Sequence, residues 1–356
     1  MIRYSEGMDG KSPPTQSRRR RPHWVALADA QLLQLRLCDL ELTLAGSLLE
    51  QRLQRLYGEL ERRGIHFRPH FWLAEEWFSP DGVPGIAVPF YLAHPRLEQL
   101  ERHFMHRAEG GNSVELMRIL RHEAGHAIDT AYRLRNRRSW RSVFGSPALP
   151  YPDSYRARPF SHRYVHHLDD WYAQSHPTED FAETFAVWLK PNSDWRSRYA
   201  QWPALDKLMY VDGLMPTLRD RAPLVRSRAH IEPLRDCRMT LAEHYEAKVL
   251  RYRTPRPTIA DGLLRRVFTT RPPRAAAPRA SAVLRECRSR VVATVARDAQ
   301  VEPYTVQQAL RRVIDRAEVL SLQVRGPRRL AQRRARGLLL QLVQRMGRGP
   351  TRQIHL

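Results

Sequence analysis

The chain has 356 residues, of which 42% are hydrophobic, and its 60 Lys and Arg against 37 Asp and Glu give a net charge of +23. This apolar content can fill a sizeable core, which excludes a wholly disordered or fibrous chain. No apolar run reaches the roughly 20 residues of a membrane span, and the polar start of the chain lacks the apolar stretch of a secretory signal. The three cysteines are too far apart in sequence for a cysteine zinc site or a disulfide framework. We therefore expect a cytoplasmic protein that does not enter a membrane.

The positive charge is concentrated near the C-terminus. Residues 251–356 contain 24 Arg, no Lys and 6 acidic residues, a net charge of +18. Such a segment could bind nucleic acid or an acidic partner, although no nucleic-acid-binding motif accompanies it, and solvated faces of Arg-rich helices explain the charge nearly as well. The shifts in composition predict a disordered basic arm at 1–22, a main domain at 23–250, a Pro/Arg-rich linker at 251–281 and a basic helical segment at 282–356.

Apolar periodicity and capping residues predict four helices in the main domain. Leucines at helical spacing place the first over residues 29–44 and the second over 47–64, where a capping serine begins it and a glycine ends it. The third runs over 113–135 after the Asn112 cap, and an early Glu favours its N-terminus. The fourth runs over 178–189 and ends before a proline.

Between the second and third helices, two apolar and aromatic-rich stretches predict a small antiparallel sheet over residues 65–93. The Ser-Pro-Asp-Gly sequence at 79–82 is a strong turn signal between them. Pro89 favours an edge position for the second strand, because proline cannot donate a ladder hydrogen bond. The edge at 86–92 could then align an extended peptide by strand addition.

Residues 122–126 read His-Glu-Ala-Gly-His inside the third predicted helix. Residues four apart lie on one helix face, so His122 and His126 can reach one ion through neutral ring nitrogens, as zinc requires. Glu123 lies beside the first ligand and can act on a zinc-activated water as a general base. The alternative is a pair of core histidines that satisfy buried polar groups.

A catalytic zinc site needs a third protein ligand, and the fourth predicted helix offers two carboxylates. Glu179 and Glu183 are four residues apart among Phe and Trp side chains, so both share a face of an apolar helix. Buried carboxylates need partners, which an ion and its histidines supply. Either glutamate could be the ligand, and a solvated acidic face is the alternative for the pair.

The long irregular stretch at 139–175 offers further candidate groups. It contains three histidines beside two acidic residues, and these could provide an alternative ligand or a substrate contact: His162, His166, His167, Asp169 and Asp170. A polar loop packed by neighbouring aromatic residues explains them equally simply and is the favoured interpretation.

The order of these motifs resembles a known group of enzymes. H-E-x-x-H followed by E-x-F-A-E, here at 179–183, resembles the glutamate-ligand zinc peptidases, the gluzincins. The likeness is closest to anthrax lethal factor-like peptidases, in which the histidine motif continues as Ala-x-Asp and a Tyr stands seven residues before E-x-F-A-E. Asp129 and Tyr172 occupy those two positions here. The stretch at 24–211 is also similar to bacterial proteins described as zinc-binding metallopeptidases.

The resemblance implies a role for each matched residue. His122, His126 and Glu179 would hold Zn²⁺, and Glu123 would be the general base. Glu183 would hydrogen-bond a ligating histidine, and Tyr172 would donate to the developing oxyanion. Asp129 would tether the active-site helix or orient a ligand. The implied fold is α+β, a mainly helical zincin-like domain with a small antiparallel sheet.

The sequence therefore predicts a zinc-dependent metallopeptidase that hydrolyses peptide bonds in a peptide or protein substrate. The alternative is a non-catalytic zinc-containing scaffold whose basic tail binds nucleic acid or an acidic partner. Glu123 argues against that alternative, because a structural zinc site needs no base and prefers four protein ligands. Since the predicted site residues all precede 251–356, we expect that segment to be dispensable for cleavage of small peptides.

Overall fold

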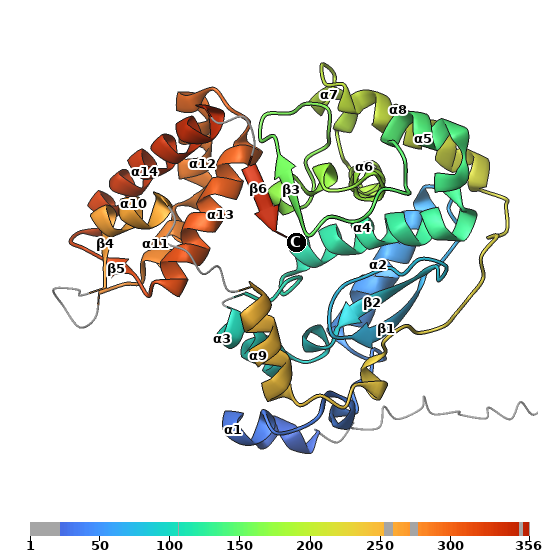
Figure 1. Cartoon of the computed structure of the whole chain (residues 1–356), viewed down its shortest axis with the longest axis horizontal. Helices are drawn as coiled ribbons and strands as arrows, with labels where there is room; N and C mark the ends of the chain where they lie inside the picture. Colours follow the sequence, from blue (N-terminus) through green and yellow to red (C-terminus); the bar gives the residue numbers. More distant parts are fainter. Residues whose placement is uncertain (1–21, 106, 253–258, 271–276, 349–351, 356) are drawn as a thin grey trace, which may run out of the picture.

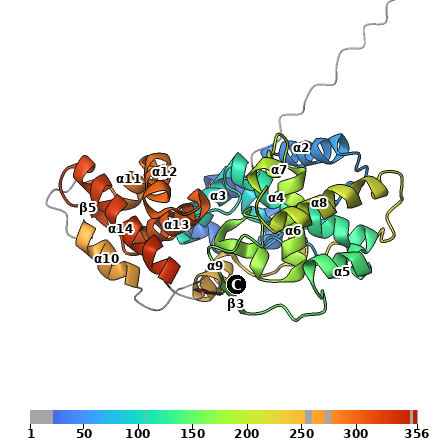
Figure 2. The same cartoon turned by 90° about the horizontal axis from the view of Figure 1, so that it is seen from above.

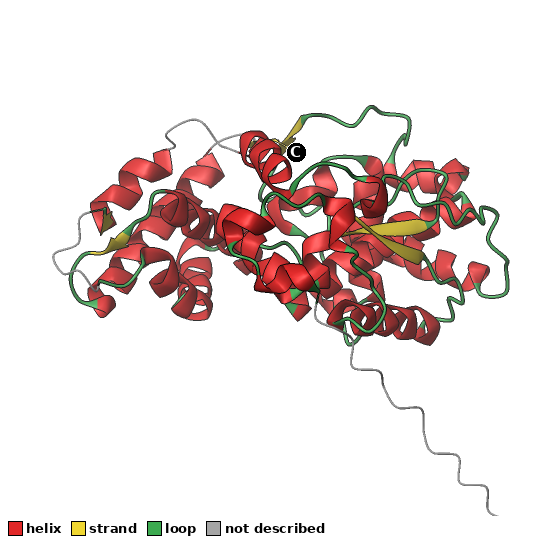
Figure 3. Ribbon diagram, turned by 90° about the horizontal axis from the view of Figure 1, so that it is seen from below, coloured by secondary structure: helices red, strands yellow, loops and turns green. Residues whose placement is uncertain are grey.

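The computed structural model describes residues 22–105, 107–252, 259–270, 277–348 and 352–355, and most of them are helical (Figure 3). The basic arm expected at 1–22 lies almost entirely outside these residues. Two hydrophobic cores organise the described chain, one built from residues between Trp24 and Tyr245 and one from residues between Leu263 and Val343. We call residues 22–252 the N-terminal unit and residues 259–348 the C-terminal unit; they lie side by side (Figures 1 and 2).

The N-terminal unit begins with short helical turns and one long helix. The elements are η1 (His23–Ala26), α1 (Asp29–Leu32), η2 (Leu37–Leu40) and α2 (Leu48–Arg62). A continuous helix over 29–44 is wrong, because the backbone there pairs with a distant segment: Leu37 N donates to Met239 O at 2.9 Å. In α2 the predicted cap is confirmed, since Ser47 Oγ accepts from Glu50 N at 3.1 Å.

The next two strands, β1 (His70–Ala74) and β2 (Gly85–Pro89), are parallel. The predicted antiparallel pairing of these stretches is therefore wrong. The predicted turn does return the chain antiparallel to β2, but the residue that pairs across it is Phe78, whose carbonyl accepts from Ala87 N at 2.8 Å. β1 lies on the other side of β2, with Trp72 opposite Ala87.

This arrangement changes the expected substrate edge. At Ala87, β2 is flanked by β1 on one side and by Phe78 on the other, and all five residues of β2 are buried. The outer edges of this small sheet are therefore β1 and the segment around Phe78, and β2 is not an edge at Ala87. The strand is followed by η3 (Phe90–Ala93) and α3 (Pro95–Met105).

Two buried helices, α4 (Ser113–Tyr132) and α6 (Pro177–Leu189), form the centre of the N-terminal unit. Both were predicted, and the Asn112 cap is confirmed because its side chain accepts from Glu115 N at 3.0 Å. Their backbones approach closely at Gly125, where an added Cβ would lie only 2.8 Å from the Cα of Ala182. Only glycine allows this contact between the two helices.

Shorter elements complete the N-terminal unit. Those between α4 and α6 are η4 (Leu134–Asn136), α5 (Arg138–Phe144), β3 (Ser154–Ala157) and η5 (Asp169–Gln174). Those after α6 are α7 (Trp195–Arg198), α8 (Ala204–Leu214), η6 (Met215–Leu218), η7 (Leu234–Asp236) and α9 (Leu241–Tyr252). The stretch at 139–175 thus remains largely irregular, as its composition indicated.

The C-terminal unit is a helical bundle with its own core. Its elements are α10 (Ile259–Val267), β4 (Phe268–Thr269), α11 (Ala280–Glu286), α12 (Arg288–Ala299), α13 (Pro303–Val319), β5 (Gln323–Val324) and α14 (Arg328–Arg348). α10 and β4 fall inside the range expected to be a linker, and α10 contributes Leu263 and Leu264 to the core.

The last described strand, β6 (Arg352–His355), pairs antiparallel with β3 of the N-terminal unit, so the two units are joined at this point by backbone hydrogen bonds (Figure 1). β4 and β5 form another antiparallel pair within the C-terminal unit. Among the helices of the described residues, none combines the length and apolarity that crossing a membrane requires.

We predict that Gly125→Ala destabilises the protein. The new methyl group would force α4 and α6 apart, which should lower the free energy of unfolding by about 1–3 kcal/mol, the usual cost of overpacking. Urea denaturation measures the effect. Gly58→Ala in α2 is the control, because no atom lies within 4 Å of its added Cβ, and helix propensity favours Ala there by about 1 kcal/mol. Equal stability of both variants would contradict the close contact.

Candidate metal centre

Three buried side chains from α4 and α6 converge at one point. His122 and His126 lie one turn apart on α4, and their Nε2 atoms are 3.1 Å apart. Glu179, in the first turn of α6, places Oε2 3.0 Å from Nε2 of each histidine. In the part of the chain that the structure describes, the side-chain donor atoms of these three residues lie close enough together to share one metal ion. The structure thus brings together the three residues expected to be ligands.

Glu183, the other candidate glutamate, lies behind the triad. Its Oε1 accepts from Nδ1 of His122 at 2.9 Å, on the side of the ring opposite the nitrogen that faces the site. Its Oε2 accepts from Leu168 N at 2.8 Å. This contact fixes the tautomer of His122 with its Nε2 lone pair directed at the shared point. Of the two glutamates, Glu179 therefore belongs to the group that could hold a metal ion, and Glu183 contacts His122 from behind.

The electrostatics of the triad are those of a buried acid–base cluster. Burial lowers the pKa of His122, but hydrogen bonds and charges from Glu179 and Glu183 outweigh it and raise that pKa well above its usual value. Burial raises the pKa of Glu179, but the charges and hydrogen bonds of the two histidines outweigh it and lower that pKa well below its usual value. A positive charge is therefore favoured at the centre of the triad, and a proton or a metal cation can supply it.

The donor set fits zinc. Two imidazole nitrogens and one carboxylate oxygen are the ligands of a three-ligand catalytic zinc site. Ligands about 2.0–2.1 Å from a tetrahedral ion lie about 3.3 Å from one another, and the observed separations are 3.0–3.1 Å. An outward movement of a few tenths of an ångström at each donor would accommodate the ion. The three side chains are nearly inaccessible to solvent, which suits a tightly held metal.

Tyr151, which no sequence pattern marked, also supports a ligand. Its hydroxyl donates to Oε1 of Glu179 at 2.9 Å, and its ring stacks on His176 with centroids 4.1 Å apart. It lies in an irregular stretch flanked by prolines, where neither periodicity nor motif spacing singles out a residue. Burial, and next the charge of Glu179, raise the pKa of Tyr151, so its hydroxyl keeps its proton for this bond.

A cavity of 890 Å³ opens beside the triad and holds the remaining chemical groups. Glu123 lines it, and among the described residues its carboxylate has no hydrogen-bond or ion-pair partner. Its backbone carbonyl accepts from Ser79 Oγ at 3.2 Å, which ties this turn of α4 to the segment after Phe78. A carboxylate without a protein partner among the described residues therefore lines the cavity next to the triad.

Tyr172 lies beside the triad. Its ring centroid is 5.6 Å from that of His122, and it lines the same cavity. Burial, and next the charges of Glu179 and Glu123, raise the pKa of Tyr172 well above its usual value. Its hydroxyl has no hydrogen-bond partner among the described residues, so it is free to donate to a ligand.

Asp129 closes the end of α4. Its Oδ1 accepts from Arg135 N at 2.8 Å and its Oδ2 from Arg135 Nε at 2.6 Å. Arg135 also pairs with Asp81 at 2.6 Å, so one side chain links the helix end to the turn after β1. Of the two roles considered for Asp129, the described contacts favour tethering of the helix.

The other histidines of the insertion lie outside the triad. His162 stacks on Trp202 with centroids 4.1 Å apart, and His166 stacks on Tyr304 at 4.4 Å. His167 Nε2 donates to Arg118 O at 2.9 Å. These contacts are those of a packed polar loop, the interpretation that the sequence favoured.

Comparison with known protein families bears on this site. Residues 98–198 match a family described as "Putative zinc-binding metallo-peptidase". The matched span runs from α3 to the end of α7 and contains the complete triad. Comparisons with curated proteins and with solved structures gave no match. Over this span the chain is thus similar to a zinc-binding metallopeptidase family.

We predict that the two glutamates of α6 separate by phenotype. Glu179→Ala should abolish zinc binding, because the ion loses a coordinating oxygen. Glu183→Ala should weaken it by about 10–100-fold, the usual effect of removing the support of a ligand. Zinc affinity is measured by competition with a chelator, and Glu98→Ala, which removes a surface pair with Arg102, is the control. If Glu183→Ala abolished zinc binding and Glu179→Ala only weakened it, Glu183 would be the ligand and Glu179 its support.

Proposed function

We propose that the protein is a zinc-dependent peptidase in which His122, His126 and Glu179 hold the ion. The observation that carries this proposal is the unpaired carboxylate of Glu123, which lines one cavity together with the buried triad. A structural metal site requires neither a free carboxylate nor an open cavity beside it. The cavity volume of 890 Å³ lies within the range of about 300–1,000 Å³ typical of ligand sites.

The residues of the cavity have the groups that peptide hydrolysis requires. When bound, Zn²⁺ supplies a Lewis acid that polarises the scissile carbonyl and lowers the pKa of water toward about 7. Glu123 accepts a proton from the attacking water and delivers it to the leaving amine. The free hydroxyl of Tyr172 donates a hydrogen bond to the oxyanion that develops on the carbonyl oxygen.

The order of the motifs supports a more specific assignment to the gluzincins. The spacing of Tyr172 and Glu179, seven residues, is that of lethal factor-like peptidases, and both residues contact or adjoin the histidines of α4. A peptide or protein is accordingly the proposed substrate.

An extended substrate has a place to align that differs from the strand favoured by the sequence. Trp77, Phe78 and Ser79 line the cavity, and Phe78 pairs with β2 on one side only. The open side of this segment can take a further strand, as in other cases of β-augmentation. We therefore place the substrate backbone along residues 77–79 and not along β2.

We predict that Glu123→Gln keeps zinc and the fold but loses hydrolysis, because glutamine preserves the shape of the side chain and cannot accept the proton. Zinc content by metal analysis and cleavage of a broad peptide library test this. Unchanged turnover in Glu123→Gln would mean that another residue is the general base. A zinc-loaded wild-type protein that cleaves nothing would favour the scaffold role, and binding of the Arg-rich segment to nucleic acid or acidic partners would then be the measurement to make.

We predict that substitution of Tyr172 changes kcat, whereas substitution of Tyr151 changes zinc affinity. Tyr172→Phe should lower kcat by about 10²–10³-fold, as loss of an oxyanion donor does, with zinc affinity unchanged. Tyr151→Phe should weaken zinc binding instead, because Glu179 loses its hydrogen bond. Steady-state kinetics and chelator competition separate the two effects. A loss of kcat in Tyr151→Phe alone would make Tyr151 the oxyanion donor.

A further inference from the structure

Two consecutive residues just before Tyr172 have a backbone conformation that needs outside support. Asp170 and Trp171, in the middle of η5, both have φ of 59°, in the left-handed region that side chains other than glycine rarely adopt. This conformation is sterically unfavourable for residues with a Cβ and persists only where surrounding contacts hold it. Because Tyr172 follows directly, these two residues set the direction in which its side chain leaves the backbone.

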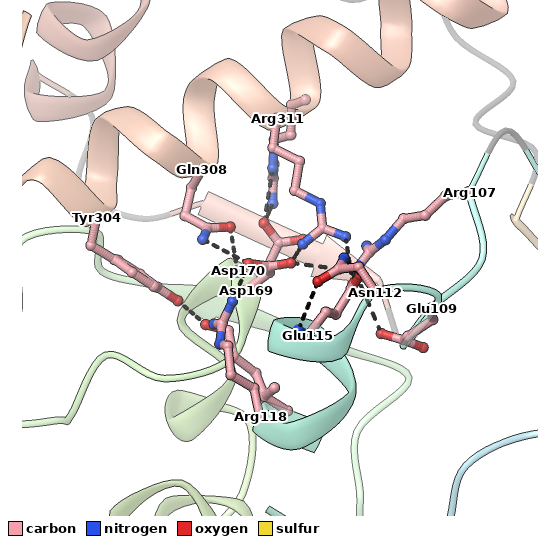
Figure 4. Close-up of polar contacts among 12 residues, drawn as sticks. Arg107, Glu109, Asn112, Glu115, Arg118, Asp169, Asp170, Tyr304, Gln308 and Arg311 are labelled. Carbon is pink, nitrogen blue, oxygen red and sulfur yellow. Dashed lines mark hydrogen bonds and ion pairs between the residues drawn. The ribbon is translucent and has the colours of Figure 1, made fainter. Parts of the chain in front are cut away.

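The support comes from the C-terminal unit. Three residues one turn apart on α13 face η5: Gln308 Oε1 accepts from Asp170 N at 2.9 Å, the Tyr304 hydroxyl accepts from Trp171 N at 3.4 Å, and Arg312 Nε donates to Asp170 Oδ1 at 3.0 Å. Figure 4 shows Tyr304, Gln308 and Arg311 of α13 pointing toward Asp169 and Asp170.

The neighbouring Asp169 is held from both units. On α13 it pairs with Arg311 and accepts from Gln308 Nε2 at 3.0 Å, and in the N-terminal unit it pairs with two arginines, Arg107 and Arg118. Tyr155 of the N-terminal unit donates to Asp170 O at 2.8 Å. The two left-handed residues thus have their backbone N–H acceptors on α13, and Asp170 also has its ion pair there, with Arg312.

The C-terminal unit also borders the reaction cavity. Arg311, Arg312 and Asp315 of α13 line it together with the triad and Tyr172. This placement bears on the expectation that the segment at 251–356 is dispensable for cleavage of small peptides, which assumed that every site residue precedes it. Its excess of arginine meets the acidic residues of η5 at this border, which accounts structurally for part of its charge.

We propose that α13 positions the catalytic tyrosine: docking of the C-terminal unit holds Asp170 and Trp171 left-handed, places Tyr172 at the metal site and so permits hydrolysis. Tyr304, Gln308 and Arg312 are positioning residues in this scheme. An undocked chain keeps its triad, because α4 and α6 hold it, but loses the tyrosine. The inference rests on the proposed peptidase function and adds regulation by contact between the two units.

The test uses the full chain with Arg312→Ala, which removes the side-chain contact with Asp170 and leaves both backbone acceptors on α13 in place. Hydrogen exchange at the amides of residues 170 and 171 should accelerate by about 3–10-fold, as expected for loss of one partly exposed ion pair. On a small peptide, kcat should fall by a similar factor with KM and zinc content unchanged. Gln308→Ala combined with Arg312→Ala should enlarge both effects.

Arg316→Ala is the matched control. Arg316 lies one turn further along α13 and makes a similar ion pair with Asp261 at 2.6 Å, inside the C-terminal unit. It should leave exchange at residues 170 and 171, and kcat, as in the wild type. An equal effect of Arg316→Ala and Arg312→Ala would mean that general loosening of the bundle is responsible, and would overturn the proposal.

A rescue distinguishes positioning from a lost substrate contact. Glycine adopts positive φ without steric cost, so Asp170→Gly added to Arg312→Ala should recover about 3–5-fold in both exchange protection and kcat. A lost contact between Arg312 and substrate could not be restored in this way. Absence of rescue, unchanged exchange in Arg312→Ala, or loss of zinc from that variant would each overturn the inference.

Failure of the proposed function and failure of this inference give different results. If the zinc-loaded wild type hydrolyses no peptide, the peptidase assignment fails, and the exchange measurements on Arg312→Ala, Arg316→Ala and the glycine variant still decide whether α13 holds η5. If the wild type is active and exchange at residues 170 and 171 does not respond to Arg312→Ala, the peptidase stands and the positioning role is overturned.

Discussion

The close approach of α4 and α6 at Gly125 and Ala182 is the contact on which the metal centre depends. Glu179 lies one turn before Ala182 on α6, so it can reach His122 and His126 only because the two backbones nearly touch. The same contact buries all three donors, and buried polar groups without partners are costly. Packing of two helices thus creates a site that favours a cation, before any ligand chemistry is considered.

A chain of hydrogen bonds connects the candidate metal centre to α13 of the C-terminal unit. Glu183 connects His122 to the backbone N–H of Leu168, and the carbonyl of Leu168 accepts from the hydroxyl of Tyr304 on α13. On the other side, Tyr151 holds the second oxygen of Glu179. The irregular stretch between α4 and α6 therefore provides contacts that orient two candidate ligands, His122 through Glu183 and Glu179 through Tyr151.

The contact between the two units combines charge with backbone conformation. Partly exposed ion pairs such as that between Arg312 and Asp170 contribute little stability one at a time. Here they meet a pair of residues whose backbone is unfavourable by itself, so even a small stabilisation helps that conformation to persist. In the function proposed above, a weak interface at a strained segment positions the side chain of Tyr172 without providing any of the three candidate ligands.

Local patterns in the sequence determined α2, α4 and α6 and the histidine motif, because caps, apolar periodicity and the spacing of His122 and His126 act within a few residues of the chain. Resemblance to known peptidases favoured Glu179 over Glu183, and the structure groups Glu179 with the two histidines. The strand direction in β1 and β2, the bond from Tyr151 to Glu179 and the contact of α13 with η5 could not be predicted. Each of these joins residues far apart in sequence, so only the packing of the complete chain decides which partners meet.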